Sequence, residues 1–242
     1  MSDLAADWGD LAQVAENVAA PAHRLFAALD RLSGSLTQVM LGVRGEGRRP
    51  ARADLAGLRA VAEELLAADR LVLGAGVVLE PGLLADADRY LEWRQRAAGG
   101  RYRALVLDVD PASDDPYDYP EMEWYRVPRD ERRRMVTGPY YDYRGAEHFE
   151  LTFAVPVIVG GEFVGVAGAD VPLSALEAEL LPVLRRVPLR AALVNHEDRV
   201  VTANTPHYAT RERARPVAAD LPARVVPVID DLGWSLLVTP GQ

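Results

Sequence analysis

Residues 149–171 read FELTFAVPVIVGGEFVGVAGADV, two apolar runs joined by a pair of glycines. Runs of this length are typical of buried strands, and glycines can adopt the positive φ angles that a two-residue hairpin turn requires. The stretch therefore predicts a β-hairpin, with strands over residues 149–159 and 162–169 and a turn at Gly160-Gly161. The other elements are assigned outward from this hairpin.

Upstream of the hairpin, helical patterns give way to strand-like ones. Apolar residues recur every three or four positions from Leu4 to Val39, which predicts one long helix that Pro21 kinks or splits. Asp54 is a suitable N-cap for a second helix, and short apolar runs bounded by glycine and proline then predict strands. The predicted elements are helices over residues 3–43, 54–69 and 84–96 and strands over residues 71–79 and 102–109.

Downstream of the hairpin, one short helix precedes a second set of strands. The predicted elements are a helix over residues 174–184 and strands over residues 190–195, 199–204, 225–229 and 234–238. Helices packed on a mostly antiparallel sheet make an α+β fold. We expect an N-terminal helical region over residues 1–70, a sheet domain over 71–186 and C-terminal strands over 187–242. These last strands either complete the first sheet or form a truncated second lobe.

The composition excludes several classes of function. The 242 residues carry a formal net charge of −9, which opposes binding to nucleic acid. The sequence has no lysine and no cysteine, so Schiff-base lysines, thiolate nucleophiles, disulfides and cysteine-ligated metals are excluded. The first residues show no signal-peptide pattern and no run of about 18 apolar residues occurs, so we expect a cytoplasmic protein without a membrane span.

The most informative segment for function is residues 117–143, which is rich in tyrosine and in carboxylates. It holds six of the nine tyrosines, among them Tyr117 and Tyr119, and a Trp124-Tyr125 pair. Aromatic faces attract cations, and carboxylates accept hydrogen bonds from ammonium groups. The segment therefore suits a cationic or amine-bearing ligand. The alternative is that these rings only cap the core beneath a long loop.

The hairpin and this segment together resemble Cache sensor domains, which are PDC-like, extended PAS-like domains. Residues 152–156 (TFAVP) and 165–170 (GVAGAD) look like the last two core strands of that family. Residues 138–142 (GPYYD) look like the pocket segment that leads into them, and Trp124-Tyr125 stands where many members have a Trp-Tyr pair. The resemblance covers residues 70–185. It implies a PAS-like antiparallel sheet with flanking helices and a pocket on one face.

The resemblance also implies which residues surround a ligand. In amine- and amino-acid-binding members, the matched positions enclose the ammonium group of the ligand. Together with the two loop tyrosines, the predicted ligand-binding residues are Trp124, Tyr125, Tyr140, Tyr141, Asp142, Asp170, Tyr117 and Tyr119. Such members also carry an arginine, two residues before the tryptophan, that holds a ligand carboxylate. Met122 stands there in this sequence, between Glu121 and Glu123, which favours an amine without a carboxylate. The alternative is an amino-acid-like ligand whose carboxylate is held by Arg126 or Arg134 instead.

We therefore expect a soluble Cache-type sensor that recognises an amine or related metabolite and signals through a separate partner protein. Neither a cofactor nor a metal is expected, because the acidic run from Asp108 lacks the glycine and glutamate of a calcium-binding loop. The apolar stripe of the first helix, and the paired helices that the resemblance implies, predict a homodimer. The alternatives are a small-substrate enzyme with Asp142, Asp170 and His148 as acid and base groups, or a structural subunit with a degenerate pocket.

Overall fold

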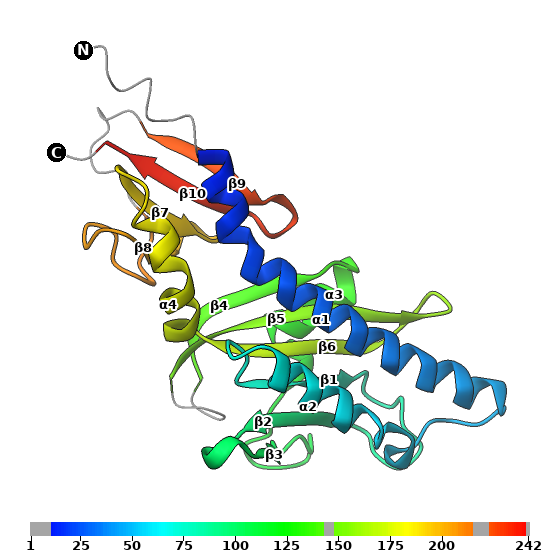
Figure 1. The fold of residues 1–242 in the computed structure, drawn as a ribbon. Helices are drawn as coiled ribbons and strands as arrows, with labels where there is room; N and C mark the ends of the chain where they lie inside the picture. The colour runs from blue at the N-terminus through cyan, green and yellow to red at the C-terminus, as the bar shows by residue number, and fades with distance from the viewer. Residues whose placement is uncertain (1–10, 143–147, 215–222, 241–242) are drawn as a thin grey trace. The chain divides into compact units, whose positions relative to one another are not determined.

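The computed structural model describes residues 11–142, 148–214 and 223–240. The chain divides into two compact units, of which the larger is residues 25–172 and the smaller combines residues 1–24 with residues 173–242. The helices are α1 (Leu11–Gly45), α2 (Leu58–Ala68), α3 (Glu123–Glu131) and α4 (Leu173–Leu184). Helix α1 contributes residues to both units, which accounts for its length (Figure 1).

The larger unit is built on one antiparallel sheet of six strands in the order β3-β2-β1-β6-β5-β4. The strands are β1 (Gly74–Leu79), β2 (Leu91–Arg96), β3 (Tyr102–Ala104), β4 (Met135–Tyr141), β5 (Phe149–Val159) and β6 (Glu162–Pro172). The predicted hairpin is confirmed as β5–β6, and its turn residues Gly160 and Gly161 have φ angles of 61° and 84°. These positive angles suit glycine because it has no Cβ.

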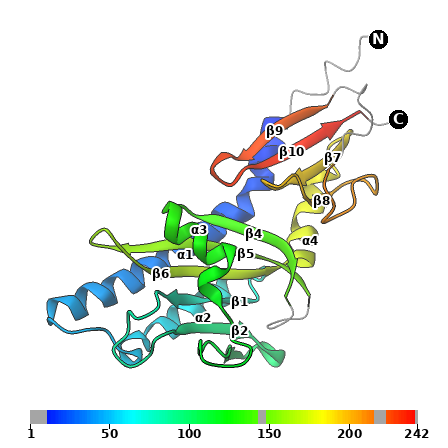
Figure 2. The same cartoon turned by 180° about the vertical axis from the view of Figure 1, so that it is seen from behind.

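Helices cover both faces of this sheet (Figure 2). Successive residues of a strand point to opposite faces, so Phe153 and Ala154 of β5 meet different helices. Phe153 faces α1, where its ring lies 5.4 Å from that of Phe26. Ala154 belongs to the cluster that includes Trp124 and Tyr125 of α3. The central strands therefore separate two layers of hydrophobic core, one against α1 and the other against α3.

Two helix predictions are corrected by the structure. The helix over residues 84–96 is wrong, because residues 91–96 form β2 and pair with β1. Leu91, Trp93 and Gln95 lie on one face of that strand, a period of two that belongs to a sheet. The second helix begins at Leu58 instead of Asp54, which forms an ion pair with Arg48 at 2.7 Å and caps only a short 3-10 turn.

The first helix is not split at Pro21. Proline removes one backbone hydrogen bond from a helix, but Val18, Ala22 and Leu25 are buried on both sides of it, and α1 continues through that position. Residues 3–10 of the predicted helix lie outside the described residues. The strand predicted over residues 102–109 ends at Ala104, as β3 lies at the edge of the sheet and has only β2 as a neighbour.

The smaller unit has a four-stranded antiparallel sheet of its own, in the order β8-β7-β10-β9. The strands are β7 (Arg190–Val194), β8 (Val200–Ala203), β9 (Arg224–Ile229) and β10 (Trp234–Thr239). The four strands predicted after the hairpin are therefore confirmed, and they pair with one another instead of completing the first sheet. The domain limits at residues 70 and 186 stay a prediction.

The close approach of β1 and β2 generates a stability prediction. A Cβ at Gly76 would lie 2.1 Å from the carbonyl oxygen of Glu92, a backbone atom that cannot turn aside. We expect Gly76→Ala to lower the free energy of unfolding by about 1–3 kcal/mol or more, as overpacking does, when measured by urea denaturation.

The matched control is Gly34→Ala, which adds the same methyl group to an exposed position of α1 with no atom within 4 Å. This change should raise stability by about 1 kcal/mol, the helix preference of alanine over glycine. Equal stabilities of the two variants would contradict the predicted backbone clash.

Candidate ligand-binding site

The sheet face that carries α3 holds a cavity. Its lining comes from β1, β2, β4, β5 and β6, from residues 105 and 107 after β3, and from the segment that leads into α3. Six of the eight predicted site residues line it, namely Trp124, Tyr140, Asp142, Asp170, Tyr117 and Tyr119. The aromatic segment and the end of the hairpin, far apart in the sequence, therefore meet at one place.

One row of the cavity floor is polar. Thr152, Asp170, Gly74 and Gln95 are successive neighbours across β5, β6, β1 and β2. Thr152 Oγ1 donates a hydrogen bond to Asp170 Oδ1 at 2.8 Å, and it lies 2.6 Å from the hydroxyl oxygen of Tyr140. These contacts fix the orientation of the Asp170 carboxyl group at the end of β6.

Two further carboxyl groups lie next to this row. Glu150 of β5 is the strand partner of Tyr140 in β4, after a shift in register between Thr137 and Tyr140. Tyr140 Oη lies 3.5 Å from Glu150 Oε1. The other oxygen, Glu150 Oε2, is buried and accepts no hydrogen bond within the described part of the chain. His148 Nε2 lies 3.7 Å from it, beyond hydrogen-bond length. Asp142, which follows β4, is the third carboxyl group of the lining.

Next to the polar row, the sheet side of the cavity is lined first by an aromatic ring and then by apolar side chains. A Cβ at Gly74 would lie 2.6 Å from Trp93 Nε1, and one at Gly168 would lie 3.2 Å from Trp93 Cη2. The indole of Trp93 can lie against the sheet because these two positions lack side chains. Beyond it, Val78 and Leu91 are paired in register and continue the lining.

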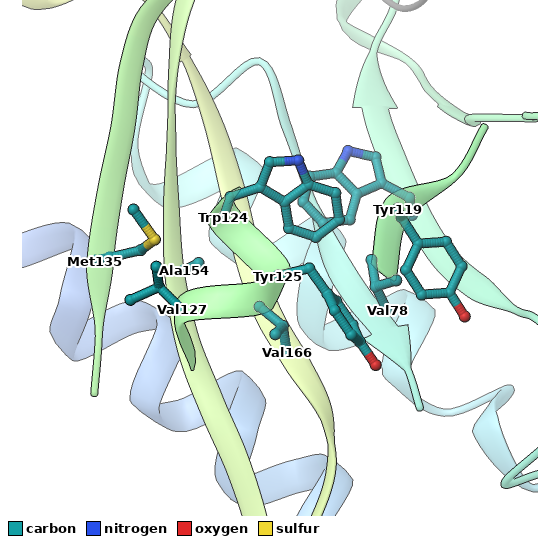
Figure 3. Close-up of a cluster of buried hydrophobic side chains, with 9 residues drawn as sticks. Val78, Tyr119, Trp124, Tyr125, Val127, Met135, Ala154 and Val166 are labelled. Atoms are coloured by element: carbon teal, nitrogen blue, oxygen red, sulfur yellow. The ribbon is translucent and has the colours of Figure 1, made fainter. Parts of the chain in front are cut away.

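Aromatic rings cover the cavity from the α3 side (Figure 3). Tyr119 and Trp124 line it, and the ring centroid of Tyr125 lies 5.0 Å from that of Tyr119 and 5.9 Å from that of Trp124. The hydroxyls of Tyr119 and Tyr125 point away from the Trp124 indole. They donate to the Leu79 carbonyl and to Glu80 Oε2, each at 2.7 Å, so both hydroxyls are engaged within the protein.

The electrostatics of the cavity are set by its carboxyl groups. Burial, and then repulsion from Asp170 and Asp142, raises the pKa of Glu150 to about 9. Burial also raises the pKa of Asp170 well above its usual range, although the hydrogen bond from Thr152 opposes the shift. No arginine, lysine or histidine belongs to the described lining. A bound cation would supply the positive charge that the cavity lacks.

Two predicted site residues do not line the cavity. Tyr125 is fully buried behind the rings that do. Tyr141 is 36% exposed and packs on Phe149, with ring centroids 5.1 Å apart. The register shift in β4 turns Tyr140 toward the cavity instead. Met122 is also outside the lining and 38% exposed.

Sequence reasoning missed four polar or aromatic lining residues, which are Trp93, Gln95, Glu150 and Thr152. Glu150 and Thr152 left a signal, because they are polar residues at alternate positions of an otherwise apolar central strand. Trp93 and Gln95 left none, since they fall in the range wrongly predicted to be helical. His148, considered as a catalytic base, does not line the cavity.

Residues 11–142, 148–214 and 223–240 show neither a metal-binding cluster nor a membrane-spanning helix. No group of three or more His, Asp and Glu side chains there is arranged to hold a metal ion. No helix in those same ranges combines the length and the apolar character needed to cross a membrane.

Comparison with known proteins finds related sensor sequences. The family model described as "Methyl-accepting chemotaxis protein-like, first PDC sensor domain" matches residues 58–178. The chain is also 30% identical over 132 residues to the methyl-accepting chemotaxis protein TlpQ of Pseudomonas aeruginosa. That match covers 47% of this chain and 18% of TlpQ, so it spans less than a fifth of the relative.

Solved structures share the fold. A structure described as methyl-accepting chemotaxis protein X has a TM-score of 0.62 at 17% identity, covering 95% of this chain and 97% of that one. The ligand-binding domain of the Pseudomonas aeruginosa amino acid chemoreceptor PctB, in complex with L-Arg, has a TM-score of 0.59 at 17% identity, covering 95% and 91%. These likenesses confirm the α+β fold with its long first helix and two sheets.

The predicted cytoplasmic location is wrong. A solved structure described as the extracellular domain of a histidine kinase shares the fold at a TM-score of 0.59 and 15% identity, over 96% of this chain and 93% of that one. The family matched by residues 58–178 is a sensor domain of chemotaxis-type receptors. The prediction rested on the lack of a signal pattern at the first residues, and that pattern does not report on where such a domain works.

The buried carboxyl groups generate a prediction on stability and pH. The pKa of Glu150 is raised to about 9 in the folded protein, so the folded state holds a proton that the unfolded state releases above its ordinary carboxyl pKa. The contribution to stability is complete below that ordinary pKa and is lost as pH rises toward the folded value, by at most about 1.4 kcal/mol per pH unit. Urea unfolding should show wild-type stability falling from about pH 5 to about pH 8 more steeply than that of Glu150→Gln.

Glu121→Gln is the control, because it removes the same charge from an exposed position outside the cavity. Its pH profile should run parallel to that of the wild type. A Glu150→Gln profile that is also parallel to wild type would show that Glu150 is not held protonated in the folded state.

Proposed function

The chain belongs to the methyl-accepting chemotaxis protein-like first PDC sensor domains, and on that basis we propose that it senses a small amine outside the cytoplasm. The amine is bound as its ammonium ion in the cavity on the α3 face. Asp170, Asp142 and Glu150 hold the charged group, and the indoles of Trp93 and Trp124 flank the rest of the ligand.

The charge of the cavity lining carries this proposal. Three carboxyl groups and no basic side chain line the described cavity. A buried charge is costly unless it is paired, so an arriving cation stabilises the ionised carboxylates that burial otherwise disfavours. An ammonium group has three donors, and each charge-assisted hydrogen bond contributes about 1.5–3 kcal/mol. An anion entering the same space would be repelled by the ionised carboxylates, and the described lining offers it only neutral donors.

An amine is preferred over an α-amino acid for the same reason. Relatives with this fold bind amino acids, since PctB is described in complex with L-Arg and the Pseudomonas fluorescens chemoreceptor CtaA in complex with L-valine. An amino acid brings an ammonium group but also a carboxylate. The donors that line this cavity, among them Gln95 and Tyr117, are neutral and give a carboxylate no charged partner.

No contact favours an acid–base enzyme or a degenerate pocket. His148 lies beside Glu150 but outside the cavity lining, so it does not face a substrate there. A degenerate pocket would have lost its polar groups, whereas this one keeps Asp170 held by Thr152 at 2.8 Å. Ligand binding without chemistry is the role that these contacts support.

We also propose that the domain reports to an output region or partner, as expected of a segment similar to less than a fifth of a chemotaxis protein. The homodimer stays a proposal. Leu25, Leu29, Leu32 and Leu36 of α1 are all buried within the chain, so the apolar stripe does not by itself require a second copy.

A thermal-shift screen of amines, amino acids and dicarboxylates tests the proposed function. A ligand present at 100 times its dissociation constant stabilises the protein by about 2.7 kcal/mol, so amines should raise the melting temperature and dicarboxylates should not. For the best amine, Asp170→Asn should weaken binding by about 1–3 kcal/mol through the loss of one charged acceptor, as measured by calorimetry.

Glu121→Gln again serves as the control and should bind the amine as the wild type does. Tight binding of a dicarboxylate would overturn the proposed function. So would an Asp170→Asn variant whose amine affinity is unchanged.

A further inference from the structure

We infer that the ligand is an amphipathic monoamine, with one ammonium group at the carboxyl groups and an apolar tail that runs over Trp93 toward Val78 and Leu91. This inference rests on the proposed function and adds to it the class of amine. It follows from the order in which the strand register arranges the lining.

The register defines an axis along the cavity floor. Asp170 pairs with Gly74, which pairs with Gln95, at the polar end. Two residues further along β2 lies Trp93, and two residues beyond that lies Leu91, which pairs with Val78. With about 3.3 Å per strand residue, the polar row and the apolar row are roughly 13 Å apart, which leaves room for a short alkyl or aryl tail to extend from the first row toward the second.

The rings that cover the cavity follow the same axis. Tyr117 lines the same cavity as Asp170 and Asp142, and it belongs to the polar end, since burial first and then these two carboxylates raise the pKa of its hydroxyl. Tyr119 belongs to the apolar end, where its hydroxyl donates to the carbonyl of Leu79, the neighbour of Val78. Floor and cover therefore change from polar to apolar in the same direction.

Among the described residues that line the apolar end, none has a charged side chain that could pair with a second ammonium group. The Tyr119 hydroxyl is already engaged at 2.7 Å. Glu80, the carboxylate near that end, does not line the cavity and accepts the Tyr125 hydroxyl at 2.7 Å. Leu105 and Leu107 complete the lining with apolar side chains. An ammonium group placed there would lose its water without gaining a partner.

A series of three ligands tests the inference on the wild-type protein by calorimetry. Hexylamine should bind about tenfold more tightly than butylamine, because its two additional methylenes are buried on the apolar row. 1,6-Diaminohexane has the same chain length but a second ammonium group, and it should bind at least about tenfold more weakly than hexylamine.

A charge placed at the apolar end should reverse this preference. Leu91 is partly buried and lines the cavity, so Leu91→Glu adds a carboxylate where the tail ends. We expect 1,6-diaminohexane to gain at least about tenfold relative to hexylamine in this variant. Val106→Glu is the matched control, because it adds the same charge to an 87% exposed residue outside this cavity, and it should leave the preference unchanged.

The outcomes separate the two claims. If no amine binds the wild-type protein, the proposed function fails. If amines bind but hexylamine and butylamine are equal, or the diamine is the tighter ligand, the proposed function stands and the amphipathic axis is wrong. The wild-type series decides this even if Leu91→Glu does not fold.

Discussion

The gathering of three carboxyl groups on one face of the large sheet, with Glu150 buried and Asp170 and Asp142 half-buried, is the constraint on which the rest of the site depends. Asp170 and Glu150 come from neighbouring central strands, and Asp142 follows the edge strand beside them. Low solvation, and repulsion from neighbouring carboxylates, disfavour the ionised forms of Glu150 and Asp170. The hydrogen bond from Thr152 to Asp170 offsets part of that cost. A proton or a cation would offset the remainder, which supports the proposed preference for a cationic ligand.

The backbone positions of the sheet make room for this arrangement. Gly74 and Gly168 leave space for the Trp93 indole to lie against the floor, so the largest ring of the lining sits between the polar row and the apolar row. On the α3 side, the hydroxyls of Tyr119 and Tyr125 donate hydrogen bonds to other groups of the protein. The cover beside one end of the cavity therefore has no free tyrosine hydroxyl, while the carboxyl groups of the lining lie at the other end.

Much of this could be predicted from the sequence, and the failures have physical reasons. The central hairpin could be predicted because two apolar runs flank Gly160-Gly161. Trp124, Tyr140, Asp142 and Asp170 were found through the family pattern. Glu150 was missed although its spacing of two from Thr152 places both polar side chains on one face of the strand, because the family pattern, not this alternation, was used to choose site residues. Trp93 was missed because its strand is defined by pairing with β1, a long-range contact that local periodicity does not report.

The most direct test of the central claim is a calorimetric comparison of phenethylamine with L-phenylalanine, which differ only by the α-carboxylate. A cavity whose described lining holds carboxyl groups and no basic side chain should bind phenethylamine at least about tenfold more tightly, a difference of about 1.4 kcal/mol. Equal affinities, or tighter binding of L-phenylalanine, would contradict the account, because the cavity would then contain a partner for the carboxylate that its lining does not show.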